Sequence, residues 1–229
     1  AHSIFNIVVS AVLFPFVKQV AWISRRLAPE KPEDKKPRLT AFIDEMQLSV
    51  PAVALKEAAR ELVRLGDATV QMFELACQAL IRQDDTAARR VLSQEEDFVD
   101  PVFKTLTQFV NTLLREDLSI HQLNRCFQLK NLLIDIERVG DLSEDIAQYA
   151  IERIENEVPF SEQAVRDLDR LYKHAHHTYE LSVRAFRDDD RDLAQKVCRR
   201  EHEFDHLYSE IRQKHIERLD AGICDPEAN

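Results

Sequence analysis

The sequence predicts an all-helical fold, built as tandem three-helix bundles behind a terminal hydrophobic helix. Only three of the 229 residues are glycine, and a glycine-poor chain rich in Leu, Ala, Glu and Arg favours helices with few tight turns. After Val53, apolar residues recur every three or four positions, which is the spacing of a helix packed on one side. Two long stretches resemble each other about 105 positions apart, which indicates an internal repeat.

Residues 1–27 form the first predicted unit, a transmembrane or membrane-associated helix. The stretch from Ile4 to Ile23 is largely apolar, and a membrane span needs about 20 such residues. Arg25 and Arg26 then supply the basic flank expected on the cytoplasmic side of a membrane. A buried or interfacial helix is the alternative. A signal peptide is not indicated, because no basic region precedes the apolar run.

Residues 28–52 are predicted to be an extended linker, since prolines and charged residues alternate there. The first bundle is expected at residues 53–157. Its first helix follows Val53, its second covers about residues 86–114, and its third covers about residues 117–154. Pro101 should bend the second helix, because proline has no backbone N–H to donate. Asp117 would cap the third.

The second bundle is expected at residues 158–229, after a break around Pro159. Helices at about 162–186 and 190–219 repeat the first two helices of the first bundle. The segment RAFRDDDRDLAQKVCRREHEFDHLY corresponds to ALIRQDDTAARRVLSQEEDFVDPVF. This second copy has no counterpart of the third helix, so the sequence predicts an incomplete second bundle.

Charge and cysteine spacing exclude several functional classes. The net charge of −10 counts against binding to nucleic acid, where a basic face supplies most of the affinity. The four cysteines show no CxxC pairing, which favours a reducing compartment over a disulfide framework or a zinc knuckle. The sequence has no glycine-rich phosphate loop, no nucleophile elbow and no HExxH helix. We therefore expect that the protein is not an enzyme.

Paired carboxylates recur along the predicted helices. Glu137 and Asp141 lie four residues apart in the third helix, within ERVGD, and would share one helical face. Like charges at this spacing repel by a few tenths of a kcal/mol. The same spacing occurs twice more, at Glu96 with Asp100 and at Glu201 with Asp205. One such pair is more often a solvated surface than a ligand set, and three pairs in a repeat make the two interpretations equal alternatives. If the helices pack as antiparallel neighbours, the carboxylates would converge on a face that suits Mg²⁺, Mn²⁺ or iron.

Several further side chains are weaker candidates near these pairs. Gly140 would let a neighbouring helix or ligand approach closely, although glycine inside a helix costs about 1 kcal/mol. The acidic candidates are Asp135, Glu144 and Asp145, and the histidine candidates are His174, His176, His177, His202 and His206. We expect the histidines to be mainly solvated helix residues, with metal binding as the minority alternative.

The run NLLIDIERVGDLSEDIAQYAI resembles the signature of the PhoU family of phosphate-uptake regulators. The segments EEDFVD and EHEFD resemble that family's other acidic motif. The resemblance covers roughly residues 53–229 and implies five of the six helices of a tandem PhoU fold. It also implies a metal-binding role, with Fe, Mn, Mg or Zn as candidate ions. The implied ligands are Glu96, Asp100, Glu137, Asp141, Glu201 and Asp205.

The N-terminus and linker, AHSIFNIVVSAVLFPF followed by SVPAVALKEAARELVRLGD, resemble the junction in bacterial sodium–phosphate cotransporters. There a last membrane helix leads into a cytoplasmic PhoU-like region. This resemblance implies a regulatory region of a sodium-dependent phosphate transporter at the bacterial inner membrane. Its partners would be the transporter's own membrane domain, lipid at the N-terminus and a second copy in a homodimer. The alternatives are a soluble PhoU-type regulator and a metal-storage or redox protein.

Overall fold

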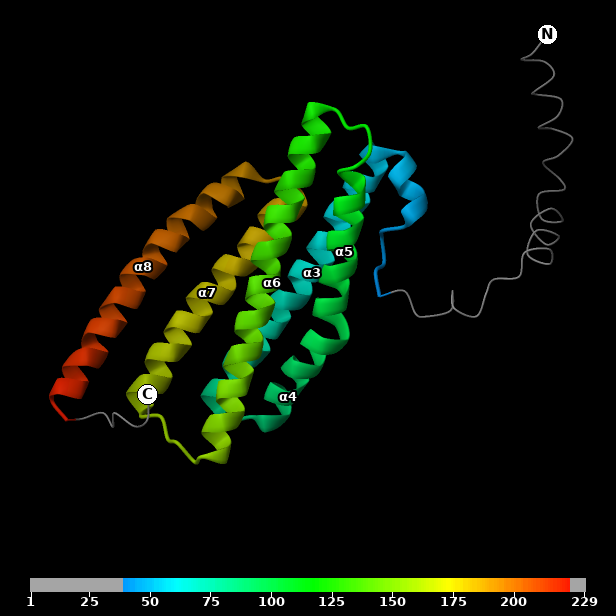
Figure 1. Ribbon diagram of the computed structural model, residues 1–229. Helices are drawn as coiled ribbons and strands as arrows, with labels where there is room; N and C mark the ends of the chain where they lie inside the picture. The colour runs from blue at the N-terminus through cyan, green and yellow to red at the C-terminus, as the bar shows by residue number, and fades with distance from the viewer. Residues whose placement is uncertain (1–38, 223–229) are drawn as a thin grey trace, which may run out of the picture. The chain divides into compact units, whose positions relative to one another are not determined.

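The computed structural model describes residues 39–222, which form helices and no strands (Figure 1). The described elements are η3 (Glu45–Ser49), α3 (Pro51–Arg82), α4 (Asp85–Gln94), η4 (Glu95–Val99), α5 (Asp100–Leu113), α6 (Ile120–Glu155), α7 (Glu162–Asp188) and α8 (Arg191–Asp220). The all-helical prediction is confirmed. The predicted hydrophobic helix at residues 1–27 lies outside the described residues, and none of the helices described is both long and apolar enough to span a bilayer.

The helix boundaries follow from capping side chains. Asp84 accepts a hydrogen bond from the Ala87 N–H at 3.0 Å and starts α4. Asp190 does the same for α8, where the Leu193 N–H donates at 2.9 Å. The predicted cap of α6, Asp117, is wrong by two residues. Ser119 caps this helix, because its side chain and that of Gln122 form a reciprocal capping box.

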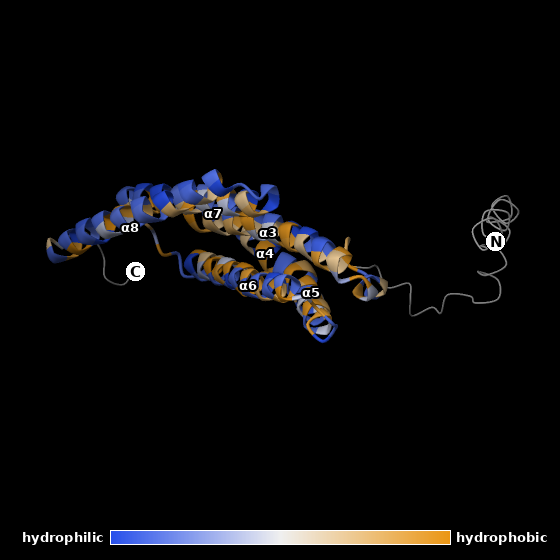
Figure 2. Ribbon diagram, turned by 90° about the horizontal axis from the view of Figure 1, so that it is seen from above, coloured by the Kyte–Doolittle hydropathy of each residue, from blue (hydrophilic) through white to orange (hydrophobic). Residues whose placement is uncertain are grey.

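The main core lies between α3, the α4–α5 pair and α6. The residues of α3 that recur every three or four positions after Val53 are all buried: Leu55, Ala58, Leu62, Leu65, Thr69, Met72, Ala76 and Ala79. Side chains from the other two sides close the core, notably Val102, Leu106 and Val110 of α5 and Leu129 and Leu133 of α6. Figure 2 shows hydrophobic residues gathered where these helices face one another.

The second repeat packs against the first through α7, and α8 packs on α7. At Gly66 an added Cβ would lie 3.3 Å from both γ-methyl groups of Val183, so the absence of a side chain lets α3 and α7 approach closely. One turn further along, the hydroxyls of Thr69 and Tyr179 are hydrogen-bonded at 2.7 Å. Ile211 is the only buried residue of α8, and Figure 2 shows this helix as mostly hydrophilic.

The segment just before α3 belongs to the packed structure, although the sequence assigned it to the linker. Glu61 of α3 is fully buried, and its Oε2 accepts hydrogen bonds from the backbone N–H groups of Ala41 (2.9 Å) and Phe42 (2.8 Å). Its Oε1 accepts one from Arg64 Nε at 2.8 Å. Ile43 joins the main core. Residues 39–49 are therefore attached to the first bundle.

Candidate functional site

The second helix of the first bundle contains a π turn, the five residues of η4. At its end the Asp100 N–H donates to the carbonyl of Glu95, five residues back. Pro101 follows directly and cannot donate a backbone hydrogen bond, which loosens the α-helical ladder at this point. The predicted bend at Pro101 thus takes the form of one extra residue in the preceding turn. The π turn also changes which acidic side chains share a face.

Glu95, and not Glu96, is the buried carboxylate of this turn. Glu95 is 6% exposed, and its Oε2 has no hydrogen-bond partner. Glu96 is exposed to solvent. The Glu95 carboxylate lies against Gly140 of α6, where an added Cβ would come within 2.9 Å of Oε2 and 3.3 Å of a methyl group of Val99. Gly140 is therefore needed for close approach, as its position in ERVGD predicts.

Several acidic side chains from α5 and α6 face the same region. Burial raises the pKa of Glu95 to about 7, and four neighbouring negative charges add to the effect. In decreasing order these are Asp141, Asp100, Glu144 and Glu137. The pKa of Glu137 is raised as well, first by burial and then by Asp141 and Asp100. We call Glu95, Asp100, Glu137, Asp141 and Glu144 the acidic face.

Three of the predicted ligands, Asp100, Glu137 and Asp141, therefore lie together. Asp100 also forms an ion pair with Lys104 at 2.6 Å. The sequence pattern does not single out Glu95, because in an uninterrupted α-helix Glu96 and Asp100 would be one turn apart. The available signal was the Glu95–Glu96 doublet followed by Pro101, which offers an acidic residue in either register.

The third predicted pair, Glu201 and Asp205, is exposed on α8. Figure 1 shows α8 as the outermost helix beside α7, so the structure does not bring this pair to the acidic face. The neighbouring His202 and His206 are exposed, as expected.

The histidines of α7 differ from one another. His177 is exposed, as predicted, whereas His174 and His176 are half-buried. His174 Nε2 lies 3.6 Å from a Glu203 carboxylate oxygen, and His176 Nε2 lies 3.7 Å from one of Glu74. These two histidines therefore contact the neighbouring helices α8 and α3.

The acidic face offers the oxygen ligands that a hard metal ion prefers, but its side chains are not arranged around a common point. Carboxylate oxygens are the ligands that Mg²⁺, Mn²⁺ and iron accept. One such oxygen, Glu95 Oε2 beside Gly140, is buried and has no hydrogen-bond partner. Within residues 39–222, no three His, Cys, Asp or Glu side chains stand close enough together to hold an ion as they are placed. Ligand side chains would have to rotate towards a bound cation.

Comparison with known proteins identifies both repeats. The family model for the PhoU domain matches residues 62–150 and 168–228. A Salmonella typhimurium protein named "Putative inorganic phosphate export protein YjbB" is 24% identical over 219 residues, which are 95% of this chain and 40% of the relative. A protein of the same name in Escherichia coli strain K12 gives the same identity and coverage. This chain thus spans less than half the length of these relatives.

A second kind of relative is shorter. The Clostridium acetobutylicum protein named "Phosphate-specific transport system accessory protein PhoU homolog" is 27% identical over 159 residues, which are 69% of this chain and 71% of the relative. No solved structure matches the chain. The two domain matches cover both halves of the repeat and include the acidic segments around Glu95 and Glu137. The chain belongs to the PhoU domain family.

Proposed function

We propose that this chain is a PhoU-type regulator that acts on a phosphate transporter through protein contacts. The observation that carries this proposal is the pair of PhoU domain matches, one to each repeat of the helical fold. The names of the relatives point the same way, since one group is named for phosphate export and the other for accessory function in phosphate-specific transport. The role proposed is regulatory and not catalytic.

The regulator could act as a separate accessory protein or as one region of the transporter polypeptide. The Clostridium relative, of which the chain covers 71%, favours the accessory form. The Salmonella alignment favours the second form. It includes 219 of 229 residues, so it must extend ahead of residue 62, where the PhoU match begins. In that form residues 1–27 would lie in the inner membrane, the bundles would be cytoplasmic, and the transport would be sodium-dependent. The coding sequence ahead of residue 1 distinguishes the two forms.

The acidic face is the part of this regulator for which we propose metal binding. Glu95, Glu137 and Asp141 would hold the cation, with Asp100 released from Lys104 to join them. A bound cation would neutralise carboxylates that now repel one another. The Glu201–Asp205 pair on α8 stays a separate prediction, because both residues are exposed and lie apart from the acidic face.

Metal analysis of variants tests this ligand set. The purified chain is stripped with a chelator, loaded in turn with Fe, Mn, Mg or Zn, and analysed for bound metal by mass spectrometry. Glu95→Gln and Gly140→Ala should each weaken binding at least tenfold, since each removes or displaces a buried donor. Glu96→Gln is the matched control and should bind like the wild type. Binding that survives Glu95→Gln but fails in Glu96→Gln would assign the ligand role to Glu96 and contradict the geometry.

Phosphate flux in cells tests the regulatory role. Deleting the segment that encodes residues 53–229 should change the uptake or efflux of radiolabelled phosphate in the native organism. Restoring the wild-type segment should reverse the change, and the double variant Glu137→Gln/Asp141→Asn should reverse it only in part. Unchanged flux after the deletion, at both low and high external phosphate, would overturn the proposal.

A further inference from the structure

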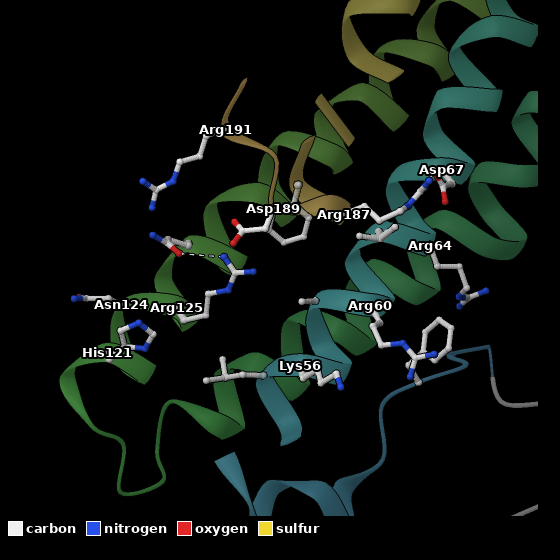
Figure 3. A pocket seen from close by; sticks show the side chains of 16 residues that line it. Lys56, Arg60, Arg64, Asp67, His121, Asn124, Arg125, Arg187, Asp189 and Arg191 are labelled. Atoms are coloured by element: carbon white, nitrogen blue, oxygen red, sulfur yellow. Dashed lines mark hydrogen bonds and ion pairs between the residues drawn. The ribbon is translucent and has the colours of Figure 1, made fainter. Parts of the chain in front are cut away.

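A basic pocket lies away from the acidic face, among α3, the first turns of α6 and the junction of α7 with α8 (Figure 3). Its volume is about 1100 Å³. Six basic and two acidic side chains line it, in a chain whose net charge is −10. The basic side chains are Lys56, Arg60, Arg64, Arg125, Arg187 and Arg191. The local charge therefore has the opposite sign to that of the chain as a whole.

Half of these cations have no carboxylate partner. Arg187 forms an ion pair with Asp67, and Arg60 and Arg64 form ion pairs with the acidic residues three positions before them. Lys56, Arg125 and Arg191 have no ion pair with any carboxylate in the described part of the chain. Asp189 is the one lining acid left to offset these three charges. An unbalanced cluster of cations attracts an anionic ligand.

The N-terminus of α6 strengthens the positive field at this pocket, whereas the N-terminus of α8 is already capped by the Asp190 carboxylate. His121 and Asn124 belong to the first turns of α6, and Arg191 is the first residue of α8. α6 is 36 residues long, has a neutral cap and no acidic residue in its first turn, and a helix N-terminus carries roughly half a positive charge from its aligned peptide dipoles. Helix dipoles and side-chain cations at the same opening favour negative charge together.

Aromatic rings hold two of the guanidinium groups in place. Arg125 lies over the ring of Phe186 at 5.0 Å, and Arg60 lies over the ring of Phe42 at 4.1 Å. Stacking leaves the edge of a guanidinium, with its planar set of N–H donors, able to match the oxygens of a phosphate in pairs. Arg60 Nη1 donates to Glu57 at 2.7 Å and Arg125 Nη1 donates to Gln128 at 3.3 Å, so each group has its other nitrogens to offer. The pocket thus presents partly ordered donors.

We propose that this pocket binds an oligophosphate, either inorganic or as the phosphate tail of a nucleotide. Small-molecule sites span about 300–1000 Å³, and this pocket is at the upper end of that range. It therefore has room for a ligand larger than one phosphate ion. Three unpaired cations suit an anion that carries several negative charges. The choice of phosphate over carboxylate rests on the proposed function, whereas the choice of a multivalent anion rests on the pocket alone.

Calorimetric titration of the full chain tests the proposal. The metal-stripped protein is titrated with tripolyphosphate, ADP, ATP, orthophosphate and citrate in 100 mM NaCl. Tripolyphosphate and the nucleotides should saturate one site, with orthophosphate and citrate at least tenfold weaker. Tripolyphosphate binding without nucleotide binding would support the inorganic form of the ligand. Citrate that binds as tightly as tripolyphosphate would overturn the assignment of phosphate.

Variants locate the site. Arg125→Gln and Arg191→Gln should each weaken tripolyphosphate binding about tenfold, because each removes a charged donor. Arg199→Gln is the matched control, since Arg199 is exposed on α8 outside the pocket. An equal loss in Arg199→Gln, or binding only to vesicles of anionic lipid, would overturn the site. This binding test uses no transporter, so its failure would leave the proposed regulation of phosphate flux standing.

Discussion

Glu61 and Glu95 are two buried glutamates of the same bundle with opposite surroundings. Glu61 accepts two backbone N–H bonds and pairs with Arg64, so its charge is compensated where it lies. Glu95 has an unpartnered oxygen and four acidic neighbours. The first arrangement stabilises the attachment of residues 39–49. The arrangement around Glu95 destabilises the folded chain whenever Glu95 is ionised. Such an arrangement is expected at a site that binds a cation or holds a proton.

The stability of the metal-free protein should therefore fall as pH rises. The folded state holds the Glu95 proton up to a pKa of about 7, whereas the unfolded state releases it near 4.5. Between these values the folded state binds more protons, so the free energy of unfolding decreases with increasing pH. Glu95→Gln should remove this loss and be more stable than the wild type at pH 8, on the order of 2 kcal/mol. Urea unfolding at pH 5 and pH 8, with a chelator present, measures the difference.

Glu96→Gln serves as the control for that experiment. Glu96 is exposed, so its substitution should change the free energy of unfolding by less than about 0.5 kcal/mol at either pH. A gain at pH 8 in Glu96→Gln that equals the gain in Glu95→Gln would show general relief of charge repulsion. It would count against a special role of the buried carboxylate.

At the scale of elements, the helices follow from the sequence almost completely. The residues that apolar spacing places on the packed side of α3 are all buried, although Glu61, Val70 and Cys77 are buried beside them. The breaks before Asp85 and around Pro159 lie where polar and proline residues predict them. The π turn could not be predicted in this way. Hydrophobic spacing leaves a one-residue insertion unresolved, because Val91 before the π turn and Val102 after it are both fully buried. The buried carboxylate of Glu95 was not predicted for the same reason.

Because α3 and α7 approach closely at Gly66, we expect a side chain at this position to disturb their packing. Gly66→Ala adds a methyl group 3.3 Å from both methyl groups of Val183, a stiff β-branched side chain. Alanine should gain about 1 kcal/mol in helix propensity, but we expect a net loss of about 1 kcal/mol from overpacking. The double variant Gly66→Ala/Val183→Ala should recover part of that loss, as thermal unfolding of all four proteins would show. Additive effects would mean that the two residues do not touch.

At the scale of the whole molecule, the two repeats differ in how much apolar surface they bury and in the charged groups that they carry. The first repeat encloses the main core and carries the acidic face, whereas α8 buries one residue and is largely hydrophilic. The basic pocket draws on both repeats, since α3, α6, α7 and α8 all contribute to its lining. No local sequence pattern predicts such a pocket, because its cations come from segments spread along the chain from Lys56 to Arg191.

Cysteine reactivity reports on the stability of this assembly. Cys77 is buried and its pKa is raised to about 12 by burial, whereas Cys198 is exposed. At pH 8 a thiol reagent should label Cys198 rapidly and Cys77 only when the bundle opens. Peptide mass spectrometry over a series of urea concentrations should show Cys77 labelling rising with global unfolding. Rapid labelling of Cys77 in the absence of urea would contradict the packing of α3.

The π turn also affects how sequences of this kind are aligned. Glu95 and Asp100 are five positions apart, and the π turn brings them to one face of the helix, while the corresponding stretch of α8 is an unbroken α-helix. If the two copies are aligned without a gap, residues on one side of positions 95–99 are paired with their structural equivalents. Residues on the other side are paired with the neighbours of their equivalents, one position away. A gap of one position within η4 would restore equivalence, and a search for acidic motifs across such proteins should allow spacings of both four and five.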